Sequence, residues 1–190
     1  MAQSADRRRW NRRRVVAAAA LLVAIPAGCG TASAPGPAVT EVDGARVSVP
    51  VGWAFSATDP AEWAGRPTIA LLSNRPIEPV CDGDGAARRC SSPAGELVPG
   101  QLLVWWLSTT CAGPACTLPD GQRRLVGGRE AVEVTDVSAC DAMGADRHHA
   151  VFVAVSPQRT DALVVCGRTT DAGAQAQLDA LLNGIDWRTP

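Results

Sequence analysis

Alternation of apolar and polar residues near the start of the domain predicts a β-hairpin. Residues 39–42 and 46–50 alternate in this way, and Asp43-Gly44 lies between them. Asp-Gly favours a two-residue hairpin turn, which needs positive φ at its central positions. Residues 51–53 (Val-Gly-Trp) then end the second strand.

Short apolar or alternating runs continue along the chain and are separated by turn residues, a pattern typical of strands. We expect strands over 68–73, 101–109, 123–126, 130–137, 148–156 and 162–166. The second of these runs is nearly all apolar and is therefore predicted to be central in its sheet.

The connections between these strands carry their own signals. Asp59-Pro60-Ala61-Glu62 has the signature of a short helix start. The proline-containing stretch 74–100 predicts a long excursion without a regular element, and 156–161 predicts a loop.

Near the C-terminus the period of the apolar positions changes to that of a helix. The positions on one face are Ala174, Leu178, Leu181, Leu182 and Ile185. Thr170 can cap the start of this helix and Asn183-Gly184 its end. A helix with one apolar stripe after a series of strands packs on one face of an antiparallel sheet. The predicted fold class is α+β, in a single domain over residues 40–190.

The first 28 residues have the pattern of a secretory signal peptide. Six arginines precede the apolar run 15–25, and small residues follow that run. As a helix, 15–25 spans about 16 Å, against a hydrocarbon core of about 30 Å, so we do not expect a permanent transmembrane anchor. Residues 12–16 (Arg-Arg-Arg-Val-Val) also look like a twin-arginine export motif, and the export route stays open.

The residues around Cys29 resemble the lipobox of bacterial lipoproteins, in which an aliphatic residue, a small residue and Gly or Ala precede a lipidated cysteine. Ala27, Gly28 and Cys29 match this pattern, whereas Pro26 stands where Leu is usual. The resemblance implies cleavage before Cys29, lipidation (palmitate) of the mature N-terminus, and location at the extracytoplasmic face of the cell membrane.

The alternative is ordinary cleavage after Ala32-Ser33-Ala34, which would release a secreted protein. Pro35 would then follow the cut, a poor position because its ring removes an amide N–H. In both cases residues 29–39, rich in small residues and proline, are predicted to form a flexible tether.

The cysteine count supports export. The chain has seven cysteines, and six remain without Cys29. An even number in an exported chain predicts disulfides. Spacing favours Cys81–Cys90 and Cys111–Cys116, and leaves Cys140–Cys166 as a long-range bridge between strand ends. A zinc site at Cys111 and Cys116 is the alternative, but no Cys/His pair of matching spacing completes a tetrahedral set, so we expect no metal.

Charge and composition narrow the range of partners. Without the leader, 12 arginines remain against 18 acidic residues, a formal charge of −6. No basic cluster with interleaved aromatic residues remains, so we expect no nucleic-acid partner. The chain has no lysine and no tyrosine and is rich in Ala, Arg and Gly, a composition similar to that of actinobacterial proteins.

Three short motifs resemble those of a known lipoprotein domain. They are residues 47–53 (Val-Ser-Val-Pro-Val-Gly-Trp), the turn Gly127-Gly128-Arg129 into a strand, and the closing helix followed by Ile185-Asp186-Trp187. Together they resemble PsbP-like and LpqN-type domains of actinobacterial secreted lipoproteins. The resemblance implies an α-β-α sandwich with an accessory or binding role, and it transfers no catalytic residue.

Few residues suggest chemistry. His148 and His149 are neighbours on a predicted strand and should point to opposite faces, so we do not expect them to share a metal or a proton relay. Residues 82–85 (Asp-Gly-Asp-Gly) look like part of a calcium loop, but the remaining ligands of an EF-hand are missing. Trp105 and Trp106 should also face opposite sides of the sheet, and an exposed one could bind a glycan, lipid or protein.

The sequence therefore predicts a lipid-anchored envelope module without enzymatic activity or cofactor, which binds an unidentified protein or glycan. A small secreted hydrolase with two carboxylates in a cleft is the alternative from another class. A structural envelope protein is a third possibility, which the sequence does not distinguish from the first.

Overall fold

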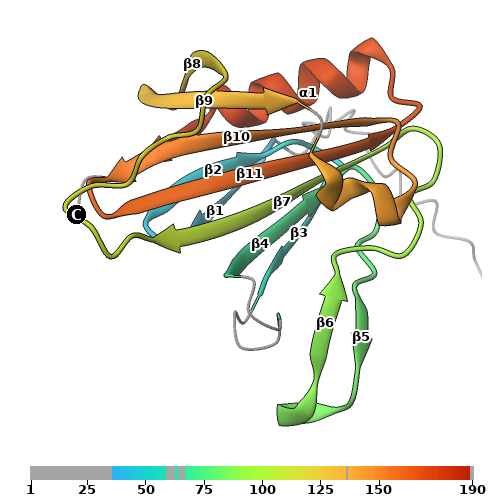
Figure 1. The fold of residues 1–190 in the computed structure, drawn as a ribbon. Coiled ribbons are helices and arrows are strands. Elements are labelled where there is room, and N and C mark those ends of the chain that lie inside the picture. Colours follow the sequence, from blue (N-terminus) through green and yellow to red (C-terminus); the bar gives the residue numbers. More distant parts are fainter. Residues whose placement is uncertain (1–35, 59–62, 64–66, 136, 189–190) are drawn as a thin grey trace, which may run out of the picture. The chain divides into compact units, whose positions relative to one another are not determined.

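The computed structural model describes residues 36–58, 63, 67–135 and 137–188. Within these residues the fold is α+β, with antiparallel strands and one α-helix (Figure 1). Cys29, the signal peptide, most of the predicted tether and the predicted helix start at 59–62 lie outside the described residues.

The largest element is a seven-stranded sheet in which all neighbouring strands are antiparallel. In spatial order its strands are β3 (Ala54–Ala57), β4 (Thr68–Ser73), β7 (Gln101–Thr110), β11 (Arg159–Arg168), β10 (Arg147–Ser156), β9 (Arg129–Thr135) and β8 (Gln122–Val126). β7 is paired on both sides, with β4 and β11, which confirms its predicted central position. β3 was not predicted. The expected loop over 156–161 is wrong, because β10 and β11 extend to a turn at Pro157-Gln158.

A second sheet has three strands, in the order β1 (Ala38–Val42), β2 (Ala45–Val49) and β12 (Ile185–Trp187). The predicted hairpin is confirmed, since Asp43 and Gly44 have φ of 44° and 84° in the turn between β1 and β2. Ala38 and Val39 belong to β1 and not to the tether.

The α-helix of the described residues, α1 (Ala172–Asn183), packs four apolar side chains into the core: Ala174, Leu178, Leu181 and Leu182. The expected cap at Thr170 is wrong. Asp171 is the N-cap, and its side chain accepts a hydrogen bond of 2.8 Å from the Ala174 N–H. The predicted end at Gly184 is confirmed, whereas Ile185 lies in β12 and not on the helix.

The segment 74–100 contains a regular element, contrary to prediction. β5 (Val80–Asp82) and β6 (Arg89–Ser92) form a hairpin around a short 3₁₀ turn, η2 (Gly85–Ala87). Two strands this short are marginal alone, and the disulfide between the paired Cys81 and Cys90 holds them together. The hairpin projects away from the seven-stranded sheet (Figure 1).

The other two disulfides are Cys111–Cys116, which spacing favours, and Cys140–Cys166, the pair that then remains, so the predicted pairing is confirmed. The expectation that Cys140 ends a strand is wrong. It lies in a second 3₁₀ helix, η3 (Ser138–Met143). Its bridge to Cys166 therefore ties η3 to β11 rather than joining two strand ends.

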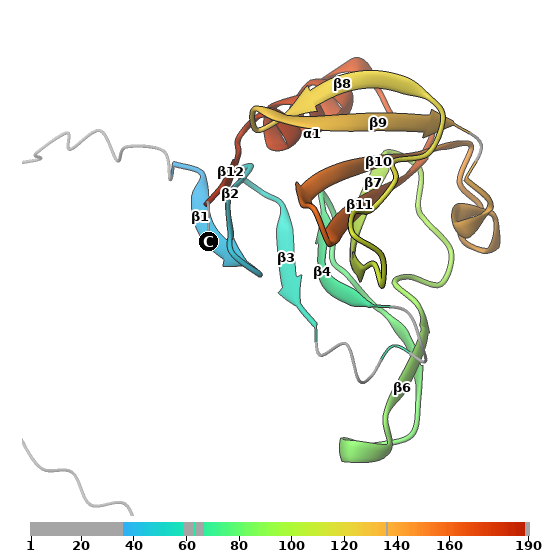
Figure 2. The ribbon, with the colours of Figure 1, turned by 60° about the vertical axis from the view of Figure 1, so that its left-hand side comes forward.

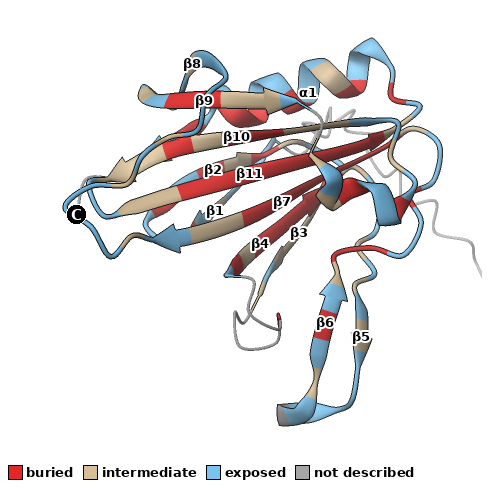
Figure 3. Cartoon of the chain, viewed as in Figure 1, coloured by how far each residue is buried: buried red, intermediate tan, exposed pale blue. Residues whose placement is uncertain are grey.

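The seven-stranded sheet separates two hydrophobic clusters. Figure 2 shows α1 and the strands β1, β2 and β12 beside this sheet, and Figure 3 shows buried segments on its central strands. Its first face carries Trp106 and Leu163 and packs against α1 and the three-stranded sheet. Its second face carries Trp105 and Val164 and packs against η3 and the segment around Leu97.

A buried polar network fixes the β1–β2 turn to the edge of the first face. Asp161 is fully buried, and it accepts hydrogen bonds from Trp106 Nε1 (2.9 Å) and from Arg159 Nε and Nη2 (2.8 Å each). Arg159 also forms an ion pair of 2.8 Å with Asp43. The hydrogen bonds to Asp161 raise the pKa of Arg159 above its usual value.

Candidate functional site

The two adjacent tryptophans do not form a ligand surface. Trp105 and Trp106 point to opposite faces, as expected, but their side chains are 1% and 0% exposed. Trp105 Nε1 donates to Thr68 Oγ1 (2.8 Å) and Trp106 Nε1 donates to Asp161. Both sheet faces are covered at this point, so the hypothesis of an exposed binding tryptophan at these positions is wrong.

The two histidines also diverge. By strand alternation His149 shares the first face with Val151, and His148 shares the second face with Ala150. His148 Nδ1 lies 3.8 Å from Asp141 Oδ1. Burial lowers the pKa of His149. The pair is not one site.

The two sequence motifs considered for metal binding do not form a metal site in the described residues. Cys111 and Cys116 are joined to each other rather than presented to zinc. Residues 82–85 lie in the turn of the β5–β6 hairpin. Among the residues that the structure describes, no three His, Cys, Asp or Glu side chains are grouped to hold a metal ion.

The strongest candidate site is a groove on the uncovered half of the second face. Its floor is one cross-strand row of Arg123 on β8, Val132 on β9, Phe152 on β10 and Ala162 on β11, which lie directly opposite one another in register. Phe152 is half-buried, whereas residues nearer η3 on the same face are covered completely. We call this strip the β8–β11 groove.

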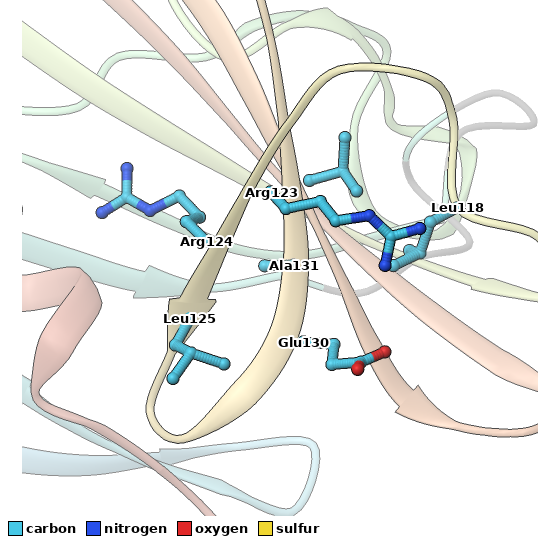
Figure 4. A pocket seen from close by; sticks show the side chains of 7 residues that line it. Leu118, Arg123, Arg124, Leu125, Glu130 and Ala131 are labelled. Atoms are coloured by element: carbon cyan, nitrogen blue, oxygen red, sulfur yellow. The ribbon is translucent and has the colours of Figure 1, made fainter.

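Two adjoining cavities occupy the groove. The first, of about 300 Å³, is lined by residues that include Leu118, Arg123, Leu125, Glu130 and Val132 (Figure 4). The second, of about 270 Å³, is lined by Thr109, Cys111, Thr117, Pro119, Phe152, Thr160 and Ala162. Val132 lines one cavity and its cross-strand neighbour Phe152 lines the other, so the two cavities are neighbours on β9 and β10.

The segment 111–121 forms the wall of the groove. The Cys111 N–H donates to Gln158 O (2.9 Å) and the Cys116 N–H donates to Pro157 O (2.6 Å), so the disulfide-closed loop is held against the β10–β11 turn. Gly121 then passes so close to β9 that a Cβ there would lie 2.7 Å from Val132 Cγ1. Only glycine allows this close approach of segment 111–121 to β9.

The groove offers apolar surface with a few polar groups. Thr160 Oγ1 is buried and has no hydrogen-bond partner among the described residues, so it can donate to or accept from a bound group. Arg123 and Glu130 place one positive and one negative charge in the lining of the first cavity. Figure 4 shows Arg123 extending toward Leu118, while Arg124 points away to the other face, where it pairs with Glu133 at 2.6 Å.

A second cleft, of about 510 Å³, lies between residues 75–80 and 94–101 and contains two carboxylates, Glu78 and Glu96. Both glutamates are exposed, and Glu96 is paired with Arg168. A glycosidase-type general acid needs an apolar, desolvated environment, which neither residue has here. This cleft therefore gives the hydrolase alternative no support.

Comparison with known proteins assigns no function to the β8–β11 groove. No protein-family model, curated protein or solved structure matches the chain. Among the described residues, no helix has the length and apolar character needed to cross a membrane.

The groove was missed from the sequence, although one signal was present. The run 123–126 (Arg-Arg-Leu-Val) does not alternate, since two apolar residues stand side by side at its end. In the structure Val126 is buried, whereas Leu125 shares the face of Arg123 and is 62% exposed. A large apolar residue at the solvent position of a strand indicates a contact site. Phe152 and Ala162 carried no such signal, since which apolar residues a loop leaves uncovered depends on the path of 111–121.

Proposed function

We propose that this protein is a lipid-anchored binding module of the bacterial envelope, held through Cys29 at the extracytoplasmic face of the membrane and without catalytic activity of its own. The observation that carries the proposal is the β8–β11 groove. It is an accessible, partly apolar strip on a sheet whose central strands are buried on both faces, with a wall held by a disulfide. Concave, largely apolar sites with a few polar groups are typical of binding sites.

The disulfides support the proposed location. Three bridges form among the six cysteines of the described domain, and such bridges persist in oxidising compartments outside the cytoplasm. These three bridges use the six cysteines other than Cys29, the residue that we propose carries the lipid.

The chemistry of the groove favours binding over catalysis. Its first cavity contains one carboxylate, Glu130, and the second contains hydroxyls and apolar carbons. An acid and a base of distinct environments, or a nucleophile beside a base, would be needed for hydrolysis. Neither combination lines the groove among the described residues.

We also propose a relationship to PsbP-like domains. In its support, Pro50 and Trp53 follow the β1–β2 hairpin, Gly127-Gly128 forms the β8–β9 turn, and β12 follows α1. The second face departs from an α-β-α sandwich, because its cover within the described residues is η3 and irregular chain rather than an α-helix.

Two measurements test the proposal. Cys29→Ala should move the full-length protein from the membrane pellet to the soluble fraction under high-salt and carbonate washes. Retention of the variant in the pellet would overturn the anchor.

For the groove, a photo-crosslinking amino acid is placed at Leu118, and as a matched control at Val80, an exposed apolar position on β5 outside the groove. In living cells we expect a discrete crosslinked species from position 118 and none of that mass from position 80. Identical patterns, or none from either position, would contradict a binding role for the groove.

A further inference from the structure

β8 is an open edge of the seven-stranded sheet. It stands last in the strand order and pairs only with β9 among the described residues. Its free side therefore presents unpaired backbone groups, which natural proteins normally protect because they attract another strand.

The hairpin geometry identifies which backbone groups are free. Gly127 and Gly128 have φ of 54° and 78°, as a two-residue type I′ turn requires. In such a hairpin the flanking residues, Val126 and Arg129, form a hydrogen-bonded pair, and pairs alternate from there. The N–H and C=O groups of Arg123 and Leu125 consequently point outward from the sheet.

The side chains of the same two residues border the first cavity of the groove. Leu125 is 62% exposed at the edge strand, and Arg123 has no hydrogen-bond or ion-pair partner within the described part of the chain. Figure 4 shows Leu125 and Arg123 on β8, with Arg123 extending toward Leu118 and Glu130 on the neighbouring β9. Free backbone groups and a side-chain pocket thus coincide at one place, the combination that strand-adding peptide sites use.

We infer that β8 binds an extended segment of a partner protein as an eighth strand of the sheet. The segment carries an acidic side chain opposite Arg123 and an apolar side chain, two residues away, opposite Leu125. This inference rests on the proposed binding function and names the kind of partner. Charge disfavours a second copy as the occupant, because antiparallel pairing centred on Arg123 or on Arg124 would place two arginines directly opposite each other.

The probe is a blocked synthetic peptide, Thr-Glu-Thr-Val-Thr-Glu-Thr, which offers the acid–apolar spacing in both strand directions. It is titrated to about 1 mM against the full-length chain, and hydrogen exchange of the Arg123 and Leu125 amides is followed. We expect saturable binding that slows exchange at these two amides. A peptide with lysine in place of glutamate should bind at least about tenfold more weakly.

Two variants separate the contributions. Arg123→Glu should weaken binding at least about tenfold, whereas Arg75→Glu, the same charge change at an exposed arginine of the other cleft, should leave it unchanged. Leu125→Pro removes an outward N–H without breaking the β8–β9 ladder and should abolish binding. Unchanged circular dichroism shows that each variant is folded.

Three results would overturn the inference: no saturable binding, binding without protection of the two amides, or concentration-dependent dimers of the wild type that Leu125→Pro converts to monomers. None of these affects membrane anchoring through Cys29. A crosslinked species from Leu118 together with unprotected β8 amides would keep the groove as a binding site and reject strand addition.

Discussion

The two faces of the seven-stranded sheet are closed in different ways. The first face is covered by regular elements, α1 and the β1–β2–β12 sheet, which bury a continuous apolar cluster around Trp106. On the second face the cover that the described residues provide lies at one end, where η3 and the chain around Leu97 pack over Trp105. Beyond that cover the same face continues as the β8–β11 groove.

This difference suits the two faces to different roles: the first face forms the larger part of the core, and the second holds the proposed binding groove. A helix and a sheet bury their side of the core without further support, so the first face needs no covalent bridge. Irregular chain cannot satisfy its backbone by itself. On the second face one disulfide ties the covering η3 to β11, and another closes the loop of segment 111–121 at the border of the cover. The uncovered strip is left where segment 111–121 borders the sheet, with Leu118, Thr117 and Pro119 lining the cavities rather than filling them.

The largest effect should come from the polar network at the edge of the first face. Arg159→Met leaves the fully buried Asp161 with only its hydrogen bond from Trp106. Removing one partner of a buried ion pair costs about 3 to 5 kcal/mol, because the remaining charge is not compensated. Urea unfolding of the full chain measures this loss.

The control for this variant is Arg188→Met. Arg188 pairs with Glu41 at 3.0 Å, but both side chains are well exposed. Such a pair contributes at most about 1 kcal/mol. Equal losses for the two arginine variants would show that the network does not secure the first face.

The second prediction concerns the cover of the second face. Cys140 and Cys166 lie 26 residues apart, and their bridge restricts the unfolded chain. Replacing both by alanine should cost about 3 to 4 kcal/mol, and replacing Cys111 and Cys116 about 2 kcal/mol, since the latter loop is shorter. The order of the two losses in urea melts is the test. A larger loss from the short loop would mean that segment 111–121 supports the fold and not only the groove.

The third prediction compares buried and exposed positions on α1. Leu178 and Leu182 are fully buried in the cluster of the first face. Either leucine replaced by alanine should cost about 2 to 5 kcal/mol through lost burial and an unfilled cavity. Asp179→Ala, on the exposed side, should change stability by less than about 0.5 kcal/mol. Leucine variants as stable as the parent would mean that α1 does not close the first face.

The first face was largely predictable from the sequence, and the reason is periodicity. Alternation located the β1–β2 hairpin and most sheet strands, and the 3.6-residue period located α1. The errors there are local. Asp171 and Thr170 are both good caps, and Ile185 continues the helical period although it follows the Gly184 C-cap. β12 is too short to show a pattern of its own.

The second face was not predictable, because its cover has no periodicity. The disulfide pairs could be predicted from the cysteine positions, but the structures that they hold could not. β5 and β6 have only three and four residues, and η3 is a 3₁₀ helix of six residues, so each is too short to show a period of apolar positions. Adjacent tryptophans on a strand predict opposite faces, but which face lies open depends on such segments. The groove therefore emerges only from the three-dimensional path of the chain.

The smallest expected effect depends on pH and arises at the margin of the first face. Burial lowers the pKa of His149, and Arg124 and His148 act in the same direction. The charges of Glu133 and Asp179 raise it without reversing the shift. The folded value consequently lies below 6.5, the value of a free histidine.

Between these two pKa values the unfolded chain binds a proton that the folded chain does not, so stability must rise with pH in that interval. The contribution of His149 is complete above pH 6.5 and declines as the pH falls toward the folded pKa. His149→Gln should remove this part of the pH dependence, whereas His148→Gln, which changes the second face, should retain it. Urea melts of the full chain at pH values on both sides of 6.5 measure the slope for each variant. If wild type and His149→Gln lose stability equally on acidification, His149 is not buried as a neutral group, and the contact of α1 with the β8–β10 side of the first face is looser than the structure has it.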